Sequence, residues 1–115
     1  MTLARSRLWR AELLKGNEGV ALVLERDALP RELEELGDFR VELPLREWRR
    51  AVRTLRGDRK LLGGLLLDYA RHKDRLAAVI ANDRAYLGLV EVITEATLAL
   101  VEGDVLDLGP AEGGA

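Results

Sequence analysis

The sequence contains no cysteine, a single histidine and few aromatic residues: two Trp, two Tyr and one Phe among 115 positions. Without cysteine, disulfides, thiolate nucleophiles and thiolate zinc sites are excluded. The lone histidine, His72, lies in the polar stretch 71–75, which indicates a solvated turn residue rather than a metal ligand. Stability must therefore come from the packing of apolar side chains.

Long apolar runs are also absent. No stretch of 18 or more apolar residues is present, so we expect no membrane-spanning segment. Charged residues interrupt the first 15 positions and break the apolar core that a secretory signal needs, so we expect a cytoplasmic protein. The 18 basic and 20 acidic residues nearly balance, and the chain as a whole has no field that favours nucleic acid or acidic lipid.

The composition that remains is typical of a folded domain. Hydrophobic residues make up 48% of the chain and charged residues 33%, which indicates a globular rather than a disordered protein. We expect one domain over residues 1–108, followed by a flexible tail over 109–115. The spacing of apolar residues shows no internal repeat.

The first part of the chain predicts one helix and two strands. Apolar residues recur every three or four positions near the N-terminus, which predicts a helix over 3–15. Turn residues over 16–19 lead into an unbroken apolar run over 20–24, which predicts a central strand covered on both faces. Residues 39–43 alternate apolar and polar side chains, which predicts a half-buried strand at an edge of the sheet.

The clearest helix follows Pro44, a residue that favours the start of a helix, and ends at Gly57. Its apolar stripe consists of Leu45, Trp48, Val52 and Leu55. A last helix is predicted from Asn82 and Asp83, which can cap it, to Gly103. Residues 105–108 are expected to add a short strand or a docking segment.

The stretch between these helices fits two interpretations. Its apolar residues Leu61, Leu62, Leu65, Leu66 and Tyr69 also match a helix period. Two adjacent glycines, Gly63 and Gly64, would cost a helix interior about 2 kcal/mol relative to alanine. We therefore predict a hairpin of two strands, over 65–70 and 76–80.

Catalytic chemistry finds little support in the sequence. The only serine, Ser6, lies far from the histidine, so a hydrolase triad cannot be assembled. The glycines of Gly16-x-x-Gly19 lack the Lys and hydroxyl of a phosphate loop and precede a strand. A cluster of carboxylates is interleaved with leucines and is typical of a solvated face, with a paired acid/base role as the alternative. Its members are Glu32, Glu34, Glu35 and Asp38.

One surface is a candidate binding site. The predicted helix after Pro44 carries five arginines opposite its apolar stripe: Arg46, Arg49, Arg50, Arg53 and Arg56. A solvated face is the ordinary interpretation of such a pattern. The functional interpretations are a docking surface for an acidic protein partner and, more weakly, a nucleic-acid surface.

Two fragments of the chain resemble the Roadblock/dynein light chain family, in particular its MglB-like bacterial members. The apolar strand before Asp27-Ala28-Leu29-Pro30 is similar to the first strand and turn of the family, with Ala28 in place of the usual glycine. The segment 76–90 is similar to the last strand of the family and to the Leu-Gly start of its final helix. The acidic insertion over 31–38 departs from the family pattern.

This resemblance implies an α+β fold with a five-stranded antiparallel sheet and helices on both faces, in the order α-β-β-α-β-β-β-α. It also implies a homodimer whose interface includes Trp48, Val52 and Leu55. Members of the family are adaptors without catalytic residues or cofactors, and bacterial members commonly bind and regulate small Ras-like GTPases. The position of the third strand is left open by the sequence.

Three functional hypotheses follow. The first is a non-catalytic, dimeric regulatory or scaffold protein that binds a small GTPase or another cytoplasmic protein. The second is a small α+β domain that binds nucleic acid or associates with ribosomes through the arginine-rich helix. The third is an enzyme that works through carboxylates, and we expect the chain not to be one.

Overall fold

The computed structural model describes residues 2–16, 19–36, 38–70, 76, 79 and 81–103. Its strands are β1 (Thr2–Arg5), β2 (Trp9–Leu13), β3 (Gly19–Leu24) and β4 (Phe39–Pro44). Two short 3-10 helices join β3 to β4, namely η1 (Arg26–Ala28) and η2 (Arg31–Leu36). The helices that follow are α1 (Leu45–Leu55), α2 (Arg59–Leu67) and α4 (Asp83–Glu102).

The strands form one antiparallel sheet in the order β1-β2-β3-β4, so each strand pairs with its neighbour in the chain. All six residues of β3 are buried, which confirms the predicted central strand over 20–24. In β4 the apolar residues Phe39, Val41 and Leu43 are buried and alternate with half-exposed charged residues. The half-buried edge strand predicted over 39–43 is therefore also confirmed.

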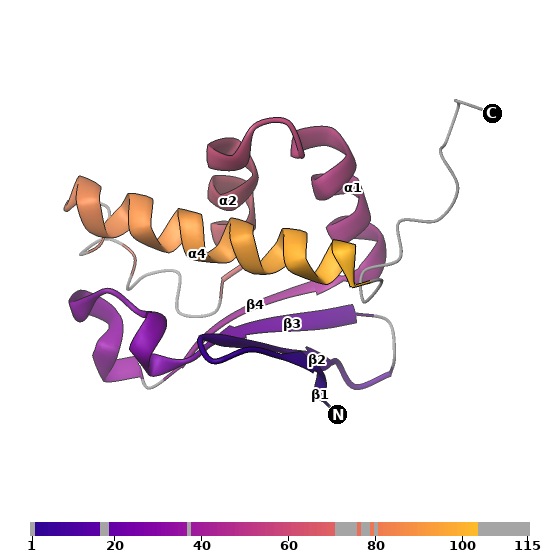
Figure 1. Cartoon of the computed structure of the whole chain (residues 1–115), viewed down its shortest axis with the longest axis horizontal. Coiled ribbons are helices and arrows are strands. Elements are labelled where there is room, and N and C mark those ends of the chain that lie inside the picture. The colour runs from indigo at the N-terminus through magenta and orange to yellow at the C-terminus, as the bar shows by residue number, and fades with distance from the viewer. Residues whose placement is uncertain are drawn as a thin grey trace.

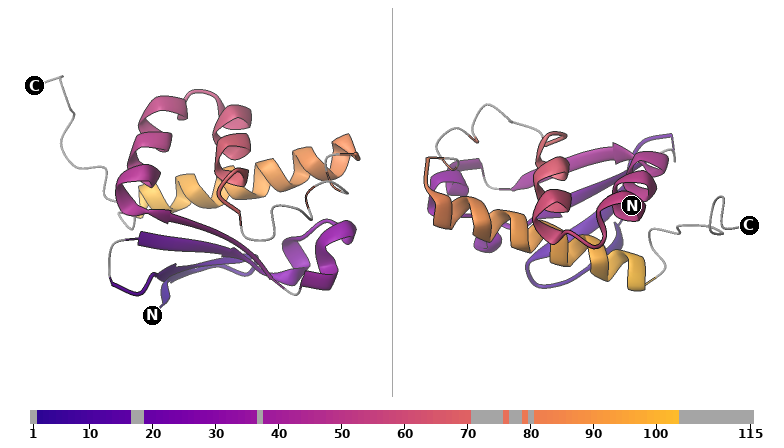
Figure 2. Two further views of the ribbon diagram at one scale, coloured as in Figure 1. Left: turned by 180° about the vertical axis from the view of Figure 1, so that it is seen from behind. Right: turned by 90° about the horizontal axis from the view of Figure 1, so that it is seen from above.

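The helices α1, α2 and α4 lie together on one face of the sheet (Figures 1 and 2). The core fills the space between them and the sheet. Its largest fully buried side chains come from both layers and include Trp48, Phe39, Leu22, Leu62 and Ile93. The segment of η1 and η2 lies beside the N-terminal half of α4 in these views, and its buried Leu29 and Leu33 belong to the same core.

Helix α1 confirms the helix predicted after Pro44 and is anchored by Trp48. The indole Nε1 of Trp48 donates a hydrogen bond to the carbonyl oxygen of Val20 in β3, at 2.9 Å and away from solvent. The side chain itself is fully buried. Trp48 thus fixes the apolar stripe of α1 to the sheet and leaves the opposite side of the helix outward.

The last helix, α4, confirms the helix predicted from Asn82 to Gly103. The side chain of Asn82 accepts a hydrogen bond from the backbone N–H of Ala85, at 3.2 Å, and so caps the first turn. Gly103 is the C-terminal cap. Two buried threonines donate hydrogen bonds from their hydroxyl groups to backbone carbonyl oxygens. Thr97 donates to Ile93 of the same helix, and Thr94 donates to Arg59 of α2.

The predicted helix over 3–15 is wrong, because this stretch forms the hairpin of β1 and β2. Residues 9–13 alternate apolar and charged side chains, and pairing of β2 with β3 buries Ala11 completely on the helix-covered side. Tertiary pairing therefore overrides the three-to-four spacing that the apolar residues also allow. The tight turn between the strands is closed by the N–H of Ser6, which donates to the carbonyl of Trp9 at 2.8 Å.

The predicted hairpin of 65–70 and 76–80 is wrong as well. Residues up to Leu67 belong to α2, and Ala70 forms only an isolated bridge with Val41. Of the second predicted strand, the described residues Leu76 and Val79 are helical. The glycine pair fits a helix here because α2 packs closely on α4: a Cβ added at Gly63 would lie 2.5 Å from Val90 Cγ1.

The expected five-stranded sheet with helices on both faces is therefore incorrect. The described chain has a four-stranded sheet, and its helices α1, α2 and α4 lie on one face. The element order that the resemblance implied is not the order observed. The predicted turn 71–75 with His72, the segment 105–108 and the tail 109–115 lie outside the described residues.

Candidate functional site

The outward side of α1 carries the arginines that the sequence singled out. Arg46, Arg50 and Arg53 are exposed along the helix, Arg56 is exposed at its C-terminal cap, and Arg49 is half-exposed. Because Trp48 and Val52 hold the opposite side in the core, the guanidinium groups share one face. We call these five residues the arginine face.

The spacing of the arginine face places like charges next to one another, so they repel. Arg46 and Arg50, and likewise Arg49 and Arg53, are four residues apart, where side chains of a helix are neighbours. Each like-charged pair at this spacing destabilises a helix by about 0.2–0.5 kcal/mol. Arg46, Arg50 and Arg56 form no ion pair with any residue that the structure describes. An anionic partner would therefore relieve the repulsion.

A groove lies between α1 and α2 at one border of the arginine face. Its volume is about 320 Å³, and it is lined by Glu47, Arg50, Ala51, Thr54, Leu55, Leu65 and Tyr69. Tyr69 is 45% exposed, which is high for a large apolar side chain. Tyrosine and arginine are among the residue types enriched at the positions that contribute most to the binding energy of protein interfaces. The groove thus places an apolar hollow directly beside Arg50.

The residues expected at a dimer interface lie mainly inside the single chain. Trp48 and Val52 are fully buried in the core, and Leu55 is partly buried and lines the groove. Two of the three side chains are therefore not available at the surface of the folded chain. Any contact between copies through α1 would have to use the arginine face or the groove.

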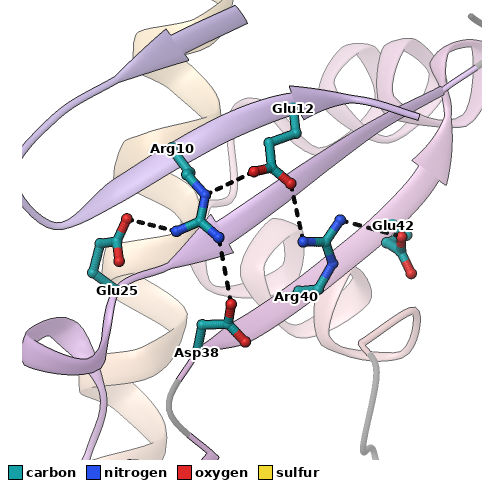
Figure 3. Close-up of polar contacts among 6 residues, drawn as sticks. All are labelled: Arg10, Glu12, Glu25, Asp38, Arg40 and Glu42. Carbon is teal, nitrogen blue, oxygen red and sulfur yellow. Dashed lines mark hydrogen bonds and ion pairs between the residues drawn. The ribbon is translucent and has the colours of Figure 1, made fainter. Parts of the chain in front are cut away.

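The opposite face of the sheet carries a charged network that the sequence analysis missed. Figure 3 shows its six residues: Arg10, Glu12, Glu25, Asp38, Arg40 and Glu42. Arg10 is the centre, with contacts of 2.8 Å to Glu12, 2.7 Å to Glu25 and 3.4 Å to Asp38. Arg40 contacts Glu12 at 3.0 Å and Glu42 at 3.6 Å. We call this set the sheet-face network.

The sheet-face network follows from strand register. Ala21 of β3 lies between Glu12 and Glu42 on the neighbouring strands, and Val23 lies between Arg10 and Arg40. Ala21 and Val23 are both fully buried although they are on the side away from the helices. The long charged side chains therefore cover the small ones with their aliphatic stems. The charged side chains thus cover the face of the sheet on which further helices were expected from the sequence.

Contacts within the sheet-face network stabilise the charged forms of Glu12 and Arg10. The hydrogen bond from Arg10 lowers the pKa of Glu12, and the one from Arg40 adds to this effect against the opposing influence of burial. Glu12 and Glu25 in turn raise the pKa of Arg10. A general acid needs a raised carboxyl pKa, so the shift of Glu12 is opposite to the one that such a role requires.

The signal that could have revealed this network is a repeated motif. Arg10-x-Glu12 and Arg40-x-Glu42 have the same spacing, and two residues apart on a strand means the same face. The first motif falls within the predicted helix over 3–15, where side chains two residues apart point in different directions. That prediction therefore separates side chains that the sheet brings together.

The remaining candidates from the sequence are not gathered into one site. Glu34 and Glu35 are exposed on η2, whereas Asp38 contacts Arg10 in the sheet-face network. Gly16 lies in the turn after β2 with a positive φ of 95°, which glycine adopts at no steric cost. In the described ranges no group of three or more His, Asp or Glu side chains is placed to hold a metal ion.

Comparison of the chain with protein-family models, with curated proteins and with solved structures finds no match. None of the helices in the described part of the chain is both long enough and apolar enough to cross a bilayer.

Proposed function

We propose that this chain is a non-catalytic binding module that docks an acidic segment of a partner protein on α1 and in the groove between α1 and α2. The observation that carries the proposal is the position of the groove, which opens beside Arg50 at the border of the arginine face. An acidic segment with one apolar side chain would match both features. The carboxylates would meet the guanidinium groups, and the apolar side chain would enter the groove beside Tyr69.

The local charge supports an acidic partner. The stretch from Arg46 to Lys60 contains seven basic residues and two acidic ones, Glu47 and Asp58, within a chain whose net charge is −2. Such local asymmetry attracts oppositely charged surfaces and speeds their association. Guanidinium groups suit carboxylates in particular because they can form two parallel hydrogen bonds with one carboxylate.

The acidic partner can be tested with defined peptides. A fluorescent peptide that alternates Glu with Leu is expected to bind the full chain, more weakly as salt is raised. Arg50→Glu is expected to weaken binding about tenfold or more, because it replaces an attractive contact with a repulsive one at the groove. Arg84→Glu makes the same change of charge at an exposed position of α4 and is expected to have little effect.

The same experiment separates the alternatives. Equal losses from Arg50→Glu and Arg84→Glu, or equal binding of a Lys–Leu peptide, would contradict the proposed docking face. Tighter binding of a single-stranded oligonucleotide, with a steep salt dependence, would favour the nucleic-acid alternative instead. Tyr69→Ala tests the groove separately from the charge, and it should weaken the Glu–Leu peptide without changing the salt dependence.

Regulation of a small Ras-like GTPase and formation of a homodimer stay predictions that rest on the resemblance. Features of β1 oppose pairing of sheet edges, because the strand is short, carries an irregularity between Thr2 and Ala4, and ends at the exposed Arg5. Light scattering distinguishes the possibilities. A dimer that dissociates on Arg50→Glu would place a second copy of this chain, rather than a different protein, on the proposed docking face.

A further inference from the structure

A second basic region lies at the turn between β1 and β2, beside η1. It forms an open pocket of about 510 Å³ whose lining residues are all charged or polar and come from the end of β1, the turn, the start of β2, and Glu25 with η1. Four of its side chains are guanidinium groups, from Arg5, Arg7, Arg10 and Arg26, against the two carboxylates of Glu25 and Asp27. We call it the hairpin pocket.

The charges of the hairpin pocket are not all committed to contacts within the chain. Glu25 is engaged by Arg10 at 2.7 Å, and Arg10 is held in addition by Glu12 and Asp38. Arg5, Arg7 and Arg26 are exposed and form no ion pair with any part of the chain that the structure describes. Three cations without an internal partner therefore border one hollow.

A hydroxyl group adds a neutral donor. Ser6 Oγ accepts a hydrogen bond from the backbone N–H of Leu8 at 3.2 Å, which holds the oxygen in the turn. The hydroxyl hydrogen is not used in this bond and can be donated to a ligand. The turn itself is fixed by the bond from the N–H of Ser6 to the carbonyl of Trp9. The pocket thus offers several donors on a short, closed turn.

We propose that the hairpin pocket binds the phosphate group of a small molecule. Arg5, Arg7 and Arg26 would supply the charge, because guanidinium groups match phosphate oxygens in pairs of hydrogen bonds. A phosphomonoester carries a charge of about −1.5 to −2 at pH 7, which suits a pocket with two more cations than anions. Arg10, fixed by three carboxylates, forms a rigid part of the wall.

The surroundings favour a compact anion over an extended one. Arg10 joins the hairpin pocket to the sheet-face network, in which four carboxylates outnumber two guanidinium groups. A nucleic-acid strand leaving the pocket over this face would bring its phosphates against Glu12, Asp38 and Glu42. A single phosphate or pyrophosphate group can enter the pocket without meeting them.

The test is titration of the full chain with inorganic phosphate and with pyrophosphate at constant ionic strength, followed by calorimetry and by NMR of the arginine side chains. Saturable binding is expected, tighter for pyrophosphate. Arg26→Gln is expected to weaken it about tenfold, since a charge-assisted hydrogen bond contributes on the order of one such factor. Lys15→Gln removes the same charge in the turn after β2, beyond the other end of the strand, and is expected to change the affinity less than about twofold.

A variant that is expected to raise the affinity for pyrophosphate complements those that lower it. Asp27→Asn removes the carboxylate that competes with the ligand, so it is expected to tighten pyrophosphate binding severalfold. Non-saturable binding, equal effects of Arg26→Gln and Lys15→Gln, or arginine signals that respond only on α1 would overturn the proposal. Tighter binding of a 12-nucleotide single strand than of pyrophosphate would do so too, because it would show that the surface takes a polymer.

Discussion

Helices α2 and α4 pack closely at Gly63, and this contact makes a sharp prediction for Gly63→Ala. A Cβ at this position would lie 2.5 Å from Val90 Cγ1, 2.7 Å from Thr94 Oγ1 and 2.8 Å from the carbonyl oxygen of Val90. The last of these atoms belongs to the backbone of α4 and cannot move by a side-chain rotation. The substitution should therefore push α2 and α4 apart.

Two opposing effects set the size of the change. Replacing glycine by alanine inside a helix contributes about 1 kcal/mol of stability through propensity alone. Overpacking a close contact costs about 1–3 kcal/mol, and displacement of Thr94 would add the loss of its hydrogen bond to Arg59, about 1 kcal/mol. The balance is a destabilisation of about 2 kcal/mol. For a domain of this size it corresponds to a fall of about 8 °C in Tm.

The neighbouring glycine is a matched control in the same helix. A Cβ at Gly64 would meet only the hydroxyl oxygen of Tyr86, at 3.4 Å, and that side chain can give way. Gly64→Ala is therefore expected to stabilise the protein by up to about 1 kcal/mol. Urea unfolding followed by circular dichroism measures both variants. If Gly63→Ala proves as stabilising as Gly64→Ala, the close packing of α2 on α4 at Gly63 is refuted.

Two further predictions concern the sheet. Trp48→Phe removes the hydrogen-bond donor to the carbonyl of Val20, so the free energy of unfolding in urea should fall by about 1–3 kcal/mol. Trp9→Phe, at a partly buried position, should lower it by less. Equal losses from the two substitutions would contradict the anchoring role of Trp48. Folding lowers the pKa of Glu12, so its ionised form stabilises the folded state at pH values above its ordinary pKa of about 4.5. This stabilisation is lost as the pH falls through the lowered pKa of the folded state. Glu12→Gln should therefore flatten the loss of stability below about pH 4.5, and an unchanged pH profile in thermal unfolding would show that the contacts to Arg10 and Arg40 have no such effect.

The elements that could be predicted are those with one consistent pattern. The unbroken apolar run of β3, the alternation in β4 and the stripe of α1 each fit a single secondary structure, and α4 adds a cap at Asn82. The arginine face could be predicted for the same reason, since it follows directly from the correct helix. Local pattern and final structure agree at these places.

Elsewhere the deciding interaction lies far away in the sequence. Residues 9–13 fit a strand only once β3 is present beside them, and the alternation there competes with a helical spacing of the same apolar residues. Gly63 would be unfavourable in an isolated helix and is required where Val90 of α4 approaches it. The sheet-face network was missed for the first of these reasons, because two of its members lie on β2.

The order of the elements along the chain has a consequence for synthesis in the cell. The meander is complete at Pro44, but α4, which covers much of it, ends only at Glu102. At about 5–20 residues per second, translation needs roughly 3–12 s to add that stretch. During this interval α1 and α2 can pack on the sheet, but the part of its apolar face that α4 covers in the finished fold stays exposed. Such an intermediate is a natural client for a chaperone at the ribosome exit.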